Sequence, residues 1–62
     1  MKCSEVFKIL KKDGWYVVSQ KGSHKKLKHD IKEGTVIFPD HGSKEMKYGT
    51  LKSILKAAGI DI

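Results

Sequence analysis

The segment with the clearest chemical potential is KGSHKKLKHD, residues 21–30, in which one histidine stands among lysines. An imidazole has a reference pKa of about 6.5, so it can take or give a proton near neutrality. Proton transfer at a phosphate needs a group that takes a proton, a group that gives one and positive charge near the phosphorus. His24 supplies the proton-transfer group, and the charge comes from Lys21, Lys25, Lys26 and Lys28.

Two small residues precede this histidine. Gly22 can adopt a positive φ in a tight turn and lets a phosphate approach the backbone, although a plain turn needs the same residue. Ser23 can donate to phosphate or close the turn through its hydroxyl, and we favour the turn. The segment is thus compatible both with a catalytic site and with a solvated strand that only binds phosphate.

The amino-acid composition indicates which class of partner the protein binds. Thirteen lysines stand against seven acidic residues, which gives a net charge of +6 without any arginine. Such a charge favours an anionic partner, most commonly nucleic acid, although a lysine-rich solvated surface explains it as well. At 62 residues the chain is expected to form one domain, residues 1–62, with a thin core.

The remaining candidates for chemistry are few. Three histidines and one cysteine at irregular spacing do not form a metal-site pattern, so we expect neither a metal nor another cofactor. Cys3 is expected to be a buried apolar residue in a helix. A single cysteine and the lack of a long apolar segment favour a cytoplasmic protein without membrane contact.

Two amphipathic helices are expected at the ends of the chain. Cys3, Val6, Phe7 and Leu10 form a helical stripe, which predicts a helix over residues 5–13 with Ser4 as N-cap and Gly14 after its end. A second stripe comprises Leu51, Ile54, Leu55 and Ala58. This helix is expected to start near Lys47 or Thr50 and to end at Gly59, with Ile60 folded back onto its last turn.

Three strands are expected between these helices. Residues 15–20 and 24–29 form a hairpin around Gly22 and Ser23, and residues 35–39 form a third strand that proline ends. A loop over residues 40–45 then leads to the second helix. The short connections predict an antiparallel three-stranded sheet with two helices on one face, an α+β fold.

The alternation of a strand separates the histidines. Leu27 is the strongly apolar residue of the second strand and should face the helices, so His24, Lys26 and Lys28 should face solvent. His29 has the parity of Leu27 and is expected to be structural. His41 lies in the loop and is expected to be exposed.

Three segments carry a family resemblance: KDGWYVVSQKGSHKKLKH, TVIFPDHG and KYGTLKSILKAAGI. In this order and spacing they resemble the HicA family of small mRNA-cleaving toxins over nearly the whole chain. The resemblance implies a double-stranded-RNA-binding-domain-like fold and ribonuclease activity on mRNA. It also implies growth inhibition and neutralisation by a HicB-type antitoxin, which is expected to cover the His24 face.

The resemblance also assigns roles to residues. The histidine of the family's G-S-H motif is catalytic and matches His24. Lys44 and Lys47 resemble basic residues that double-stranded-RNA-binding domains carry at the start of their last helix. The predicted RNA-binding residues are Lys21, Gly22, Ser23, Lys25, Lys26, Lys28, Lys44 and Lys47.

The chain departs from the family pattern twice, with Lys25 where a second histidine is frequent and Leu27 where an aromatic residue is common. These departures bear on substrate preference or rate. Without the resemblance, the residues alone would favour a non-catalytic double-stranded-RNA-binding module of the same fold. A DNA-binding protein is disfavoured, because neither helix has a basic, base-reading face.

Overall fold

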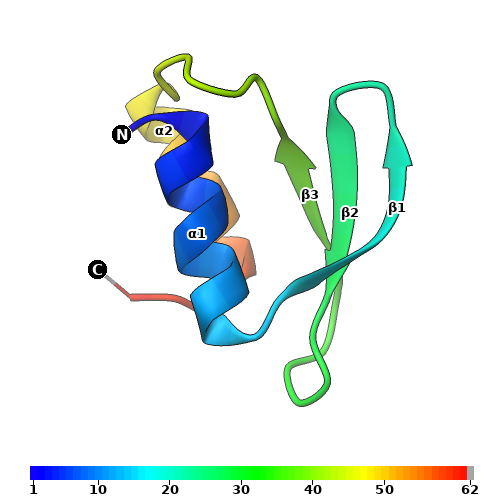
Figure 1. The fold of residues 1–62 in the computed structure, drawn as a ribbon. Coiled ribbons are helices and arrows are strands. Elements are labelled where there is room, and N and C mark those ends of the chain that lie inside the picture. The colour runs from blue at the N-terminus through cyan, green and yellow to red at the C-terminus, as the bar shows by residue number, and fades with distance from the viewer. Residues whose placement is uncertain (62) are drawn as a thin grey trace.

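A computed structural model describes residues 1–61 and shows a three-stranded antiparallel sheet with two helices (Figure 1). The strands are paired in the order β1–β2–β3, which is a meander. This arrangement confirms the predicted α+β class and element order. The elements are α1 (Cys3–Asp13), β1 (Tyr16–Lys21), β2 (His24–Lys28), β3 (Val36–Pro39) and α2 (Tyr48–Ala57).

Helix α1 begins earlier than predicted, and the expected N-cap Ser4 is wrong. Lys2 is the N-cap, and its backbone N–H donates to the Glu5 carboxylate at 2.8 Å. The N–H groups of the first turn donate to the loop before α2: that of Cys3 to the Lys44 carbonyl at 2.9 Å and that of Ser4 to the Gly42 carbonyl at 3.0 Å. Because the loop supplies these acceptors, no serine side chain is needed.

The helix ends follow the prediction. Gly59 has a φ of +68° after α2, and the Ile60 N–H donates back to the Leu55 carbonyl at 2.9 Å. This is the hydrogen bond of a Schellman motif, which needs a left-handed residue after the helix. Gly14, with a φ of +110°, ends α1 in the same way.

The core lies between the helices and one face of the sheet. Along β2 and β3 the buried residues alternate with exposed or partly buried ones, whereas every residue of β1 is exposed. The helices therefore cover β2 and β3 but not β1. One cluster holds the buried residues of both helices and of the sheet, namely Cys3, Val6, Leu10, Trp15, Leu27, Val36, Phe38, Met46, Leu51, Ile54, Leu55 and Ala58.

A two-residue turn brings the start of β2 to the edge of this core. Gly22 has a φ of +60°, and Lys21 is paired with His24 across the turn, which confirms the predicted hairpin. Leu27 is fully buried, while His24, Lys26 and Lys28 are exposed. The predicted alternation of β2 is therefore confirmed. None of the helices within residues 1–61 has the length and apolar character of a membrane span.

Candidate active site

His24 opens β2 on the exposed face of the sheet. It is paired with Lys21 on one side and with Pro39 of β3 on the other. Between residues 1 and 61, the histidine side-chain hydrogen bonds and the histidine ion pair belong to His29, and the His24 ring makes none. Both ring nitrogens of His24 are therefore available to a ligand.

A shallow hollow of about 460 Å³ lies beside this ring. Residues of β2 and β3, which form its floor, and residues of α2, which form its wall, both line it. We call it the His24 hollow, and it is lined by His24, Ile37, Pro39, Gly49, Thr50, Ser53 and Ile54. The hollow is open to solvent, so it can contact one face of a ligand but cannot enclose it.

Three of the predicted lysines share the exposed side of the hairpin with His24. Lys21 lies opposite it in β1, and Lys26 and Lys28 follow it on the same face of β2. Tyr16 is paired with Lys28, and a hydrogen bond to Asp30 raises the pKa of its hydroxyl, which stays protonated at neutral pH. This face offers positive charge beside the imidazole, with Lys28 and the Tyr16 ring at the far end of β2.

Lys25 does not belong to that face. Its Nζ lies 2.6 Å from Asp40 Oδ2 and 4.3 Å from the centre of the Phe7 ring, and its side chain is only 18% exposed. The prediction that Lys25 contacts RNA is not supported by this position. The physical reason is the strand alternation, which turns Lys25 toward the helices together with Leu27.

Asp40 holds the hairpin turn against the loop after β3. Its backbone N–H donates to the Ser23 carbonyl at 2.7 Å, and its carboxylate accepts the Gly42 N–H at 3.0 Å. The hydrogen bond from Lys25, supported by that of Gly42, lowers the pKa of Asp40 below its usual 3.8. Ser23 is thus a turn residue, as predicted, although it acts through its carbonyl.

The two lysines near α2 are both exposed. Lys47 is the N-cap of α2, two residues before the wall of the His24 hollow. Lys44 lies in the preceding loop, where its carbonyl accepts the Cys3 N–H. Their contact with RNA stays a prediction, and Lys47 is the better placed of the two.

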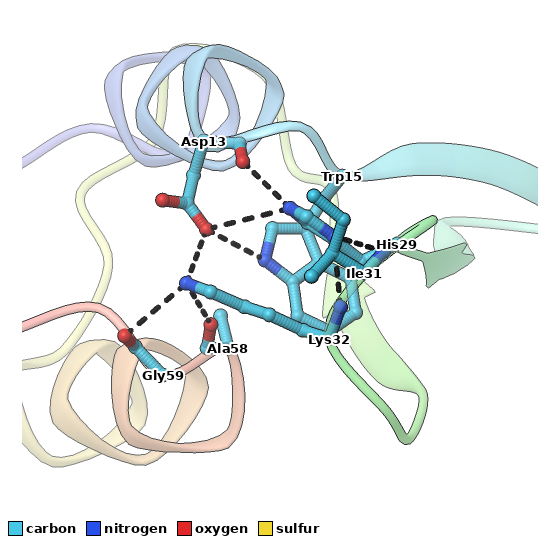
Figure 2. Close-up of polar contacts among 7 residues, drawn as sticks. All are labelled: Asp13, Trp15, His29, Ile31, Lys32, Ala58 and Gly59. Carbon is cyan, nitrogen blue, oxygen red and sulfur yellow. Dashed lines mark hydrogen bonds and ion pairs between the residues drawn. The ribbon is translucent and has the colours of Figure 1, made fainter.

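His29 occupies the opposite kind of environment, and Figure 2 shows its contacts. Its Nδ1 accepts the backbone N–H groups of Ile31 and Lys32 at 3.0 and 3.1 Å, and its Nε2 lies 2.7 Å from the Asp13 carbonyl oxygen. Nε2 therefore carries the ring proton and donates it to that carbonyl. An Nδ1 that accepts hydrogen bonds is unprotonated, so the 4.0 Å approach to the Asp13 carboxylate is not an ion pair.

Lys32 belongs to the same group of contacts as His29 and Asp13. Its Nζ donates to Asp13 Oδ2 at 2.6 Å and to the carbonyls of Ala58 and Gly59 at 3.1 and 3.3 Å (Figure 2). The hydrogen bond from Lys32 to the Asp13 carboxylate is the largest cause of the lowered pKa of Asp13. The His29 clamp, comprising Asp13, Trp15, His29 and Lys32 with the two carbonyls, joins the end of α1 to the end of α2. The prediction that His29 is structural is confirmed.

The other candidates remain peripheral. His41 is exposed in the loop after β3, and Cys3 is 2% exposed, as predicted. No three histidine, cysteine, aspartate or glutamate side chains gather into a metal-binding group among residues 1–61.

The wall that α2 gives to the hollow is not evident in the sequence. Gly49, Thr50 and Ser53 lie far along the chain from His24, and only the folding of α2 against β3 brings them beside it. One signal was present: a glycine in the first turn of a helix, at a position that ends neither a helix nor a turn.

Comparison with known proteins gives two matches. Residues 3–60 match a family model described as "HicA toxin of bacterial toxin-antitoxin". A protein of Pseudomonas fluorescens (strain Pf0-1), named "Probable mRNA interferase HicA", is 45% identical over 60 residues, which cover 97% of each chain.

Proposed function

The chain belongs to the HicA toxin family, and from that premise we propose that it is an endoribonuclease that cleaves mRNA with His24 as its catalytic residue. The observation that carries the proposal is the His24 ring, which has no hydrogen-bond partner within residues 1–61 and is exposed beside a hollow and among lysines. The name of the relative from Pseudomonas fluorescens supports the substrate class.

The proposed chemistry uses His24 as the general base. A neutral ring nitrogen takes the proton of the ribose 2′-hydroxyl, and that oxygen attacks the adjacent phosphorus. The bond from phosphorus to the 5′-oxygen breaks, and this oxygen takes up a proton as it leaves. The products are a 2′,3′-cyclic phosphate and a 5′-hydroxyl. Lys21, Lys26 and Lys28 supply positive charge to the phosphoryl oxygens as their negative charge increases.

The deciding experiment incubates purified protein with RNA in the presence of a chelator. We expect new 2′,3′-cyclic phosphate ends from the parent protein. We also expect a loss of about 10²–10⁴-fold in cleavage rate for His24→Ala, the usual contribution of a general base. His41→Ala, an exposed histidine in a loop, serves as the matched control. A band shift without fragments would instead indicate a non-catalytic RNA-binding module.

Membership of a toxin–antitoxin family implies an antitoxin partner. We propose that this partner is of the HicB type and covers the His24 face, with acidic side chains against Lys21, Lys26 and Lys28. Opposite charges across an interface accelerate association at low ionic strength. The association rate should therefore fall as salt rises, and a rate independent of salt would contradict the proposed contact.

A further inference from the structure

The wall of the His24 hollow that belongs to α2 has features that the fold does not explain. Gly49 lies in the first turn of α2, and its backbone does not have the positive φ of the five glycines that do. A Cβ built on Gly49 would meet no atom within 4 Å. Glycine is a poor helix former, so neither conformation nor packing favours it at this position.

The fold likewise does not explain the two polar residues next to Gly49. Thr50 and Ser53 are exposed and line the same hollow. In the part of the chain that the structure describes, neither hydroxyl makes a hydrogen bond. Hydroxyl groups of this kind can both donate to a phosphate and bond a ribose hydroxyl.

The floor of the hollow has a different character. Ile37 and Pro39 of β3 form it, Ile54 of α2 adds a further apolar lining residue, and Ile37 is 53% exposed. An apolar floor bordered by a few polar groups is the usual composition of a ligand site. The flat face of a base or a sugar suits the floor, and the phosphate and ribose oxygens suit the two hydroxyls and His24.

We infer that α2 forms the second wall of the active site and holds the nucleotide next to the scissile phosphate. In this arrangement Ser53 and Thr50 hydrogen-bond the ribose–phosphate backbone. Gly49 has no side chain because the nucleotide passes over it. The inference rests on the proposed function of His24 and adds a binding subsite to it.

The test enlarges the side chain at position 49. Alanine and leucine both favour a helix more than glycine does, so Gly49→Ala and Gly49→Leu should raise the thermal unfolding midpoint. Both should impair the nuclease because they fill the hollow. We expect KM for an RNA oligonucleotide to rise about two- to threefold for Gly49→Ala and at least about tenfold for Gly49→Leu. A purely structural glycine would not give higher stability together with weaker substrate binding.

A second pair of variants examines the hydroxyl contact. Ser53→Ala should lower kcat/KM about three- to tenfold, the usual effect of one lost hydrogen bond. Ser4→Ala is the matched control, because Ser4 is an exposed helical serine that does not line the hollow. Equal rates for the two variants would remove Ser53 from the subsite.

The outcomes separate the two proposals. If the parent cleaves RNA and Gly49→Leu cleaves it within twofold of the parent KM and kcat, the subsite is overturned while the nuclease stands. If the parent does not cleave RNA at all, the proposed function fails, and the subsite fails with it.

Discussion

The His24 hollow and the His29 clamp lie at the two ends of strand β2. Each contains a histidine, but the two imidazole rings have opposite environments. The ring of His29 bonds three backbone groups and packs edge-on against Trp15, with ring centroids 5.2 Å apart. The ring of His24 is exposed beside a hollow and makes no such bonds within the described chain.

The difference separates a residue that serves the fold from one that serves a ligand. Polar atoms that are buried need partners, and the fold supplies them to His29. A side chain that is exposed without partners contributes little to stability, so replacing it should leave the fold intact. The comparison therefore predicts that stability and activity depend on different histidines.

The largest expected effect on folding comes from His29→Ala. The change removes two hydrogen-bond acceptor contacts and one donor contact together with the Trp15 packing, which we expect to cost about 2–4 kcal/mol. In a domain of this size each kcal/mol shifts the unfolding midpoint by about 4–8 °C. Thermal unfolding by circular dichroism measures the shift, and His24→Ala is the matched control with an expected change within about 0.5 kcal/mol. Equal losses from both variants would remove the distinction between the two sites.

The structure divides one recognisable sequence segment between the His29 clamp and the His24 hollow. Within the segment KDGWYVVSQKGSHKKLKH, Trp15 and His29 belong to the clamp and Gly14 lies against it, whereas Gly22, Ser23 and His24 belong to the turn and the hollow. Two features require glycine at position 14. Its φ is +110°, and a Cβ there would lie 2.6 Å from His29 Nε2. Strand alternation predicts which histidine faces inward, but it does not predict the partners that hold it.

The fold was largely predictable because its signals are local. Helix stripes, glycines after helices and the two-residue turn act within a few residues of the chain, and the observed elements agree with them. The predictions that failed concern contacts distant in the sequence. The N-cap at Ser4 was displaced by the loop carbonyls of Gly42 and Lys44. RNA contact by Lys25 stays a prediction, although the side chain lies against Asp40 and Phe7. The wall of the hollow also arises from a distant element.

Neighbouring lysines on β2 sharpen the comparison at a smaller scale. Lys26 is exposed on the His24 face, whereas Lys25 is paired with Asp40 on the helix side. We expect Lys26→Gln to weaken RNA binding several-fold and to make the slope of log K against log salt shallower by about 0.7, the value of one phosphate contact on a single strand. RNA titrations of both variants in a His24→Ala background, which prevents cleavage, measure this.

Lys25→Gln is the matched control for that experiment. It should leave the salt slope unchanged and lower the unfolding midpoint, because the contacts with Asp40 and Phe7 are lost. If Lys25→Gln reduced the salt slope as much as Lys26→Gln, the assignment of the two faces of β2 would be wrong.

The smallest expected effect is the acid sensitivity of the two ion pairs, one at each end of β2. Hydrogen bonds from Lys32 and Lys25 lower the pKa values of Asp13 and Asp40 below the usual 3.8. A carboxyl group with a lowered folded-state pKa stabilises the fold above its unfolded pKa, near 3.9, and loses that contribution as the pH falls through the folded value. The unfolding midpoint should therefore change little from pH 7 to about 5 and decline below about 4.

Asp13→Asn and Asp40→Asn should each be less stable than the parent at pH 6, and the differences should shrink at pH 3. Both pairs are accessible to solvent, so the differences are expected to be small. A gap between parent and variant that stays constant with pH would show that the lost stability comes from packing and not from charge.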